Sequence, residues 1–258
     1  MKSQLLIFIC FLILGTNIAS AQNAHFTMQG VIEFDKTVNM YALIKRSINK
    51  DNESWYGPAF ENYKKNQPQF KVYKSTLTFS KDRSKFDPIP PETTSNGFFG
   101  NDPMAEQNNT IFNDLASGMS TMQKSVFEET FLVKDTTRRI NWKITTETRD
   151  ILGYKCRRAN AVILDSIYVV AFYTDQIPVS SGPESFSGLP GMILGVALPH
   201  ENITWFATKL NEIQVTEKQL APPRKGKPTD NKGLKDTLTA ALKSWGDYAK
   251  SYFKAFSL

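Results

Sequence analysis

The chain has 258 residues, of which 41% are hydrophobic and 22% are charged, so it is long enough for one sizeable globular domain or two small ones. Its formal net charge is +6, but no block of basic residues with interleaved aromatics occurs, which argues against a nucleic-acid-binding protein. Only Cys156 lies outside the N-terminal apolar segment, so an internal disulfide is excluded. The sequence favours a buried small hydrophobe for Cys156, with a reactive thiol or an intermolecular disulfide as alternatives.

Residues 1–21 are typical of a secretory signal peptide. Lys2 is their only charge, an apolar run spans residues 5–14, and Ala19-Ser20-Ala21 fits a cleavage site. We expect an exported protein whose mature chain begins at Gln22 and keeps 30 basic and 25 acidic residues, a net charge of +5. A retained membrane anchor is the alternative, but the apolar run is too short to cross a bilayer.

Apolar and polar residues alternate irregularly in the N-terminal half of the mature chain. Residues 25–43 predict one long strand or two strands kinked at Gly30. Residues 51–69 carry aromatic side chains that fit either a helix face or a loop pressed on the sheet. Residues 70–78 predict a strand, and a further strand begins at residue 85.

Residues 87–109 predict a loop rich in proline and glycine. Within it, Phe98 and Phe99 either pack into the core or form an exposed contact.

The alternation of apolar and polar residues is more regular from residue 119 onward. Seven strands are predicted there, over residues 120–124, 127–133, 139–148, 155–164, 167–174, 192–197 and 204–215. No segment of helix length interrupts them, which argues against parallel strands joined by crossover helices. We therefore predict a mainly β protein built on a curved antiparallel sheet, a half-barrel or barrel-like meander.

In the C-terminal segment the spacing of apolar residues changes from that of a strand to that of a helix. Residues 216–230 predict a basic, proline-containing linker, and residues 231–258 predict an amphipathic helix with an adjacent lysine face. That helix either covers the open side of the sheet with its lysines in solvent, or meets a membrane surface or a partner. The chain thus divides into the signal peptide 1–21, a β-rich domain 22–215, the linker 216–230 and the C-terminal helix 231–258.

The loop at residues 177–191 is the strongest candidate for a binding site. Three prolines and four glycines within residues 177–196 indicate a rigid, shaped loop that leads into a buried strand. With the end of the preceding strand, the loop supplies the candidate contacts for a ligand in the hollow of the sheet: Tyr173, Pro178, Glu184, Phe186, Gly188, Leu189, Pro190 and Gly191. The alternative is that these residues only pack the loop onto the sheet.

An ordered set of motifs over residues 139–210 resembles the GLPGLI family of exported bacterial proteins. Residues 188–193, Gly-Leu-Pro-Gly-Met-Ile, differ from the hexapeptide that names the family only at Met192. Upstream, Trp142-Lys143-Ile144 and Gly153-Tyr154-Lys155-Cys156 are similar to its "W-x-I…G-Y-x-C" segment, and Ala171-Phe172-Tyr173-Thr174 is similar to its "A-W-Y-T" run. The second departure is Phe172, where the family often has tryptophan.

The resemblance implies a location in the periplasm or cell envelope of a Gram-negative bacterium. Some members of the family are encoded near outer-membrane transport proteins, which suggests such a protein as a partner. The family's function is uncharacterised, so the resemblance provides no catalytic residues.

The residues provide little support for a catalytic site. A serine hydrolase needs a nucleophile, a base and an orienting group; the loop and the chain offer Ser180, Ser181, Ser185, Ser187, His25 and His200, but no G-x-S-x-G motif. Cys156 is predicted in mid-strand, a poor position for an activated thiol. No H-x-x-x-H, C-x-x-C or aspartate-rich loop suggests a metal, and no motif suggests a cofactor.

These observations favour a non-enzymatic binding or accessory protein of the envelope, acting on a hydrophobic ligand or with an outer-membrane transport partner. A hydrolase using Cys156 or a loop serine, and a purely structural envelope component, are the alternatives.

Overall fold

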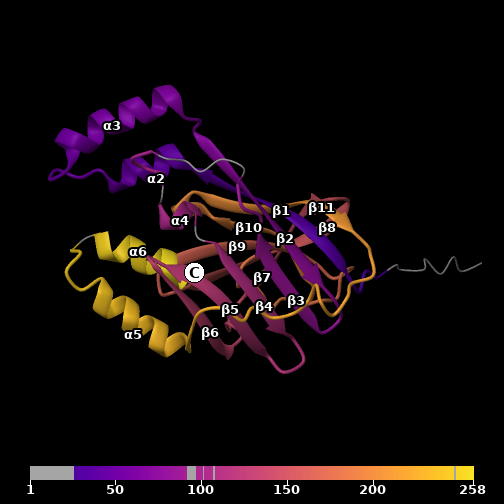
Figure 1. Cartoon of the computed structure of the whole chain (residues 1–258). Helices are drawn as coiled ribbons and strands as arrows, with labels where there is room; N and C mark the ends of the chain where they lie inside the picture. Colours follow the sequence, from indigo (N-terminus) through magenta and orange to yellow (C-terminus); the bar gives the residue numbers. More distant parts are fainter. Residues whose placement is uncertain (1–25, 92–96, 101, 107, 247) are drawn as a thin grey trace, which may run out of the picture.

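The computed structural model describes residues 26–91, 97–100, 102–106, 108–246 and 248–258, so the expected signal peptide 1–21 and His25 lie outside it. The described residues form one sheet and several helices (Figure 1). The strands are β1 (Gly30–Asn39), β2 (Phe70–Phe79), β3 (Arg83–Pro88), β4 (Asn109–Asp114), β5 (Met119–Val126), β6 (Glu129–Thr136), β7 (Lys143–Ile151), β8 (Tyr154–Ile163), β9 (Ile167–Thr174), β10 (Met192–Leu198), β11 (Ile203–Asn211) and β12 (Lys227–Thr229). The helices are α2 (Met40–Ser47), α3 (Glu53–Asn66), α4 (Pro103–Glu106), the 3-10 turn η1 (Pro199–Glu201), α5 (Asn231–Ala241) and α6 (Tyr248–Ser257).

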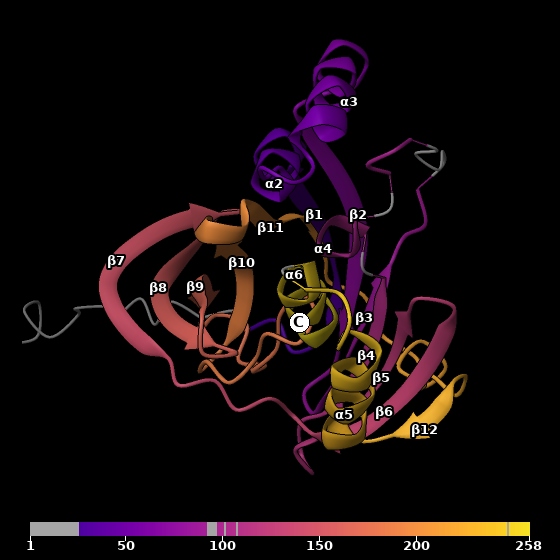
Figure 2. The same ribbon diagram turned by 90° about the vertical axis from the view of Figure 1, so that its left-hand side faces the viewer.

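The sheet consists of two meanders that meet at β1 and β11. Its order is β12-β6-β5-β4-β3-β2-β1-β11-β10-β9-β8-β7, and all neighbours are antiparallel except β12, which pairs parallel with β6. The strands at the two edges, β12 and β7, do not pair with each other, so the sheet is open. Figure 2 shows it curving around α6, with β7 to β10 on one side and β3 to β6 on the other. The prediction of a mainly β protein with a curved sheet is confirmed, in its half-barrel form.

The structure corrects the N-terminal part of the prediction. The strand expected to reach residue 43 ends at Asn39, whose side-chain oxygen accepts a hydrogen bond from the Ala42 N–H at 3.1 Å and caps α2. Residues 53–66 form the helix α3, in agreement with the helix alternative for residues 51–69, and α2 and α3 project beyond one end of the sheet (Figure 1). The expected loop 87–109 contains α4, and the strand β4 directly after it was not predicted.

Two helices occupy the segment where one C-terminal helix was expected. The apolar stripe continues through residues 231–258, but the backbone of α5 ends near Leu242, and Gly246 takes a left-handed φ of +57°. The chain therefore turns, and α6 folds back against α5. The end of the expected linker forms β12.

The apolar core has two parts. The larger part fills the hollow of the sheet between β1, β9, β10 and β11 and includes Ile177, Val179, Phe186 and Leu189 of the 177–191 loop. The smaller part lies between β5–β6 and the two C-terminal helices and consists of Val126, Phe131, Val133, Leu234, Leu238 and Phe256. The C-terminal helices thus cover one side of the sheet through a core of their own.

Candidate functional site

The 177–191 loop lies in the hollow of the sheet, where it is part of the core. Tyr173, Phe186 and Leu189 are each at most 2% exposed. Glu184 and Gly191 are also buried, whereas Pro178, Gly188 and Pro190 are exposed. The structure therefore separates the eight predicted contacts into a buried group that fills the hollow and an exposed group at the surface of the loop.

Backbone contacts hold the loop in place. The Ile193 N–H donates to the Ser181 carbonyl at 2.8 Å, and the Met192 N–H donates to the Ile177 carbonyl at 2.9 Å. Gly191 has a φ of +147°, and a Cβ there would lie 2.1 Å from the Thr174 backbone oxygen. Only glycine fits so close a backbone approach. This requirement explains the second glycine of the hexapeptide.

The exposed part of the loop is tied to the rest of the domain by Trp142. Its Nε1–H donates to the Ser187 carbonyl at 2.8 Å, and a Cβ added at the neighbouring Gly188 would lie 3.7 Å from the same nitrogen. Deeper in the loop, the Phe186 ring packs at 5.9 Å from the Trp205 ring. The loop is thus fixed from both sides.

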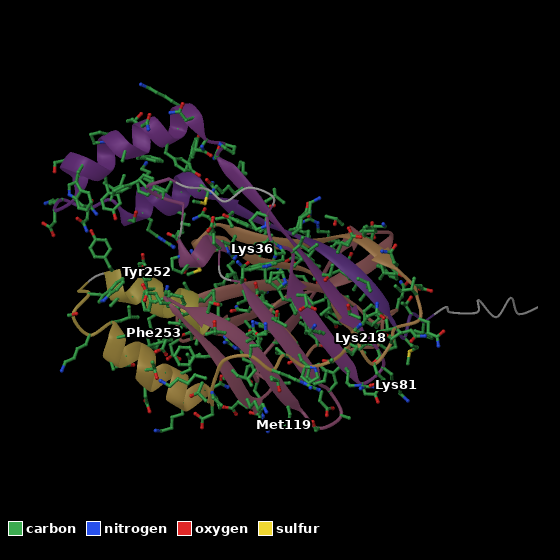
Figure 3. The ribbon with its side chains drawn as sticks, in the orientation of Figure 1. Lys36, Lys81, Met119, Lys218, Tyr252 and Phe253 are labelled. Atoms are coloured by element: carbon green, nitrogen blue, oxygen red, sulfur yellow. The ribbon has the colours of Figure 1, made fainter. Side chains whose placement is uncertain are left out.

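Buried charges surround the loop, and sequence reasoning missed most of them. Glu184 accepts a hydrogen bond from Asn109 at 3.2 Å, and burial raises its pKa against the opposing effects of Lys36 and Lys124. Lys36, which is labelled in Figure 3, donates to the Ala105 carbonyl at 2.8 Å and to the Met104 carbonyl at 3.1 Å. Burial lowers its pKa. The alternation of β1 could have revealed Lys36, because it shares a face with Phe34 and Val38.

Lys124 is a second buried lysine, 1% exposed, on the inward face of β5. Burial lowers its pKa to about 7, the charge of Arg138 acts in the same direction, and Glu184 opposes both. Its ammonium donates to the Phe256 carbonyl at 2.8 Å. These lysines join the sheet to α4 and α6.

The candidate nucleophiles occupy structural positions. The Cys156 thiol is fully buried and lies 3.5 Å from the Tyr154 carbonyl, and burial raises its pKa to about 12. The Ser181 hydroxyl donates to the Ser84 hydroxyl at 2.8 Å, and the Ser185 hydroxyl donates to the Leu258 oxygen at 3.1 Å.

His200 belongs to η1, and its ring lies 6.2 Å from the Tyr168 ring. Each of these side chains thus contacts neighbouring residues of the fold.

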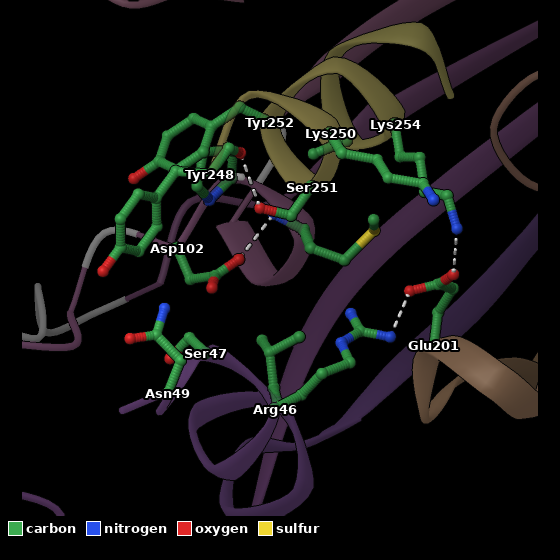
Figure 4. Close-up of a pocket in the computed structure, with 14 residues that line it drawn as sticks. Arg46, Ser47, Asn49, Asp102, Glu201, Tyr248, Lys250, Ser251, Tyr252 and Lys254 are labelled. Atoms are coloured by element: carbon green, nitrogen blue, oxygen red, sulfur yellow. Dashed lines mark hydrogen bonds and ion pairs between the residues drawn. The ribbon is translucent and has the colours of Figure 1, made fainter. Parts of the chain in front are cut away.

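A cavity of about 270 Å³ opens at the helical end of the molecule, between α2, α4, η1 and α6 (Figure 4). On one side the Glu201 carboxylate, which is 3% exposed, lies 2.6 Å from Arg46 and 3.2 Å from Lys254. Tyr248 and Tyr252 of α6 stand on the other side. The site could not be predicted from the sequence, because it joins four segments that are far apart in the chain.

Asp102 brings a carboxylate into this cavity. One of its oxygens accepts from the Met104 N–H at 2.8 Å. Burial raises its pKa even though this backbone bond, and the more distant Arg46, act against the shift. Leu43, Met104 and Ala255 add apolar surface to the lining. A cavity with aromatic, apolar and charged walls suits a small ligand that has both polar and apolar parts.

Two kinds of feature are absent from the described part of the chain. Among those residues, no three His, Cys, Asp or Glu side chains lie close enough together to hold a metal ion. None of the described helices has the length and apolar character needed to cross a membrane.

Comparison with known proteins finds a match of one short segment to a family model and a likeness of fold. The model of a family described as "Protein of unknown function (Porph_ging)" matches residues 161–195, which include the hexapeptide and the 177–191 loop. No curated protein matches the chain in sequence.

Among solved structures, the chain is similar to PNGF-II in a crystal of space group P21, with a TM-score of 0.51 and 16% identity over 81% of this chain and 33% of that chain. It is also similar to PNGF-II in space group C2, with a TM-score of 0.51 and 13% identity over 88% of this chain and 33% of that chain. The chain thus spans about a third of the length of PNGF-II. At this identity the likeness concerns the fold alone.

Proposed function

We propose that this chain is a non-enzymatic binding or accessory protein of the bacterial cell envelope, with its ligand or partner segment held in the cavity between α2, α4, η1 and α6. The observation that carries the proposal is the cavity itself. It has an aromatic side, a charged side and an apolar lining, and four segments distant in sequence build it. Such convergence of mixed side chains on a concave surface is the usual mark of a small-molecule site.

The position of the 177–191 loop moves the proposed site away from the hollow of the sheet. Phe186 and Leu189 fill that hollow, so a hydrophobic ligand does not fit beneath the loop without displacing it. The cavity at the helical end is open in the structure as it stands. We propose that the loop supports the sheet from within, and that its exposed residues Pro178, Gly188 and Pro190 are available to a partner.

Two finer assignments belong to the same proposal. We propose membership of the GLPGLI family, since residues 188–193 depart from its hexapeptide only at Met192 and lie within the matched range 161–195. We also propose export to the periplasm or envelope, directed by residues 1–21.

Native mass spectrometry of residues 22–258, purified from envelopes, tests the proposal. We expect a retained small molecule or a co-purifying outer-membrane protein. In Ser251→Trp, a bulky ring would enter the cavity from α6, and the retained species should be lost.

Thr237→Trp is the matched control. Both residues are exposed hydroxyl residues on the C-terminal helices that donate to a carbonyl of their own helix, but Thr237 is not part of this cavity. A bare protein without an envelope partner, or equal retention by both variants, would refute the proposal.

A further inference from the structure

The cavity of Figure 4 carries opposite charges on its two sides. Asp102 lies on the aromatic side with Tyr248 and Tyr252, and Arg46 and Lys254 lie on the other side. The volume of about 270 Å³ is below the range of about 300–1,000 Å³ that is typical of ligand pockets. The cavity therefore fits a small molecule with a positive group at one end and a negative group at the other.

The Asp102 carboxylate has no close counter-charge in the described part of the chain. One of its oxygens accepts from the Met104 N–H at 2.8 Å, and no described cation lies within 4 Å of it. Lys36 and Arg46 act on it from farther away, and the Lys36 ammonium donates to the carbonyls of Met104 and Ala105. A partly buried carboxylate of this kind is stabilised by a cation that enters hydrogen-bonding distance.

Two tyrosine rings of α6 lie on the same side of the cavity as Asp102. Burial and the charge of Asp102 both raise the pKa of Tyr252, so this phenol feels the field of the carboxylate. Tyr248 is held in place, because its hydroxyl accepts from the Asn52 side-chain amide at 2.8 Å. The face of a tyrosine ring attracts an ammonium group. The rings and the carboxylate together favour a cationic group on this side.

The opposite side keeps an excess of positive charge. The Glu201 carboxylate lies 2.6 Å from Arg46 and 3.2 Å from Lys254, so it balances only one of these two cations. Lys250 also lines the cavity, one helical turn before Lys254 and therefore on the same face of α6. It is exposed and forms no ion pair with any described residue. Each lysine has ammonium protons left to donate, which favours a carboxylate on this side.

Apolar side chains complete the lining. Leu43, Met104 and Ala255 belong to it, and all three are part of the larger core. An apolar group of a ligand that covers them would be removed from water, which favours binding in proportion to the apolar area covered.

We propose that this cavity binds a short peptide of two or three residues with both termini free and an apolar side chain. The terminal ammonium lies against Asp102 and the two tyrosine rings, and the terminal carboxylate lies against Lys250 and Lys254. The charges of such a peptide lie at its two ends, about 3.3–3.6 Å apart for each residue of its length, so it can reach both sides of the cavity. This inference rests on the proposed function and names the chemical class of the ligand in the same cavity.

Titration calorimetry on residues 22–258 tests the proposal with matched dipeptides. L-Alanyl-L-leucine and L-alanyl-L-phenylalanine carry both charges, their N-acetylated forms lack the ammonium, and their C-terminal amides lack the carboxylate. We expect saturable 1:1 binding of one or both free dipeptides, and binding at least about tenfold weaker for each blocked form. Absence of saturable binding by both free dipeptides, or equal binding of the blocked forms, would overturn the proposal.

Asp102→Asn should weaken binding of the better free dipeptide by about tenfold or more, because it removes the charge opposite the ammonium. The asparagine oxygen can still accept from the Met104 N–H, so the start of α4 should be retained. Asp51→Asn is the matched control, since Asp51 is an exposed aspartate just before α3 that does not line the cavity, and we expect a change below about twofold. Equal losses in the two variants would contradict the assignment of the ammonium to Asp102 and overturn the proposal.

Lys250→Gln tests the other end of the ligand on an exposed side chain, whose replacement should not affect folding. We expect binding to weaken by about threefold, less than in Asp102→Asn because solvent screens an exposed charge. Lys243→Gln is its control, because Lys243 is an exposed lysine between α5 and α6 that does not line the cavity. Equal effects of the two substitutions would indicate general attraction to lysines and would overturn the proposal.

The proposed function and this inference fail separately. Failure of the dipeptides to bind overturns the inference. A species retained in native mass spectrometry, and its loss in Ser251→Trp, would then still support the cavity as the site of a ligand of another class.

Discussion

The ammonium of Lys124 donates to the backbone carbonyl of Phe256 at 2.8 Å, across 132 residues of sequence. The bond joins the inward face of β5 to the last turn of α6. It satisfies one of the helix carbonyls that have no partner within the helix, and a cation at a helix C-terminus is favoured by the helix dipole. The C-terminal helix is thus held by a buried lysine of the sheet as well as by apolar contacts.

Replacement of Lys124 by methionine should change how stability depends on pH. The pKa of Lys124 is lowered to about 7 in the folded protein, whereas an unfolded lysine titrates near ~10.4. Between these values the unfolded chain binds more protons, so the wild-type protein gains stability as pH rises, by up to ~1.4 kcal/mol per pH unit. In Lys124→Met this contribution is absent. Urea unfolding at pH 7, 8 and 9 should show that the free energy of unfolding of the wild type rises with pH relative to that of the variant.

The control for this experiment is Lys235→Met, which removes an exposed lysine of α5. Its pH dependence should follow that of the wild type. Parallel curves for the wild type and Lys124→Met would contradict the prediction.

Most of the sheet could be predicted, because its strands carry their own hydrophobic pattern. The range 167–174 was predicted to the residue for β9, and the strands from β5 to β11 were all placed. The strand β4 was missed because Asn109–Asp114 contains only two apolar residues, Ile111 and Phe112, side by side. Its pairing with β3 and β5, rather than its own pattern, makes it a strand.

The C-terminal helices and the candidate site were harder to predict, for physical reasons. The break between α5 and α6 depends on the backbone at Gly246, while the apolar stripe continues across it. The cavity of Figure 4 depends on how distant segments meet, and a sequence pattern carries no information about that. For the 177–191 loop, the buried positions of Phe186 and Leu189 agree with the alternative that these residues pack the loop onto the sheet.

Gly191→Ala should destabilise the protein far more than Gly188→Ala. Both residues have a positive φ, +147° and +91°, so each alanine adds backbone strain of about 1–3 kcal/mol. At Gly191 the added Cβ would also lie 2.1 Å from the Thr174 oxygen, and β9 and β10 would have to move apart. At Gly188 the nearest atom is 3.7 Å away, on Trp142. Thermal unfolding of the two variants should show this order, and equal losses would mean that the close approach at Gly191 is unimportant.

Cys156 should resist alkylation in the folded protein. Its thiol is fully buried, and its pKa of about 12 leaves very little thiolate at pH 8. Incubation of residues 22–258 with iodoacetamide, followed by intact mass measurement, should show no adduct, while the same protein in guanidinium chloride should gain one. Rapid labelling of the folded protein would contradict this and would support the alternative of a cysteine hydrolase.

Glu201→Gln should lower stability at neutral pH and remove part of the acid sensitivity. Burial alone would raise the pKa of Glu201, but Arg46 and Lys254 outweigh it and hold the pKa below its ordinary value. Stability from a lowered carboxyl pKa is present above the unfolded pKa of ~4.3 and is lost as pH falls through the folded pKa. At pH 7 we expect a loss of about 1–3 kcal/mol, less than for a fully buried pair because the Arg46 side chain is 42% exposed.

Urea unfolding in a series of buffers from pH 7 downward measures this difference, which should shrink as the wild-type carboxylate becomes protonated, because urea does not screen the ion pairs. Glu217→Gln serves as the control, since Glu217 pairs with Arg83 at 2.6 Å but its side chain is 79% exposed, and solvent screens such a pair. A loss in Glu201→Gln no larger than in the control would mean that the Arg46–Glu201–Lys254 contacts contribute little to holding α2, η1 and α6 together. A larger loss at pH 7 that disappears as the pH is lowered would establish these ion pairs as the contacts that hold one side of the cavity in Figure 4 together.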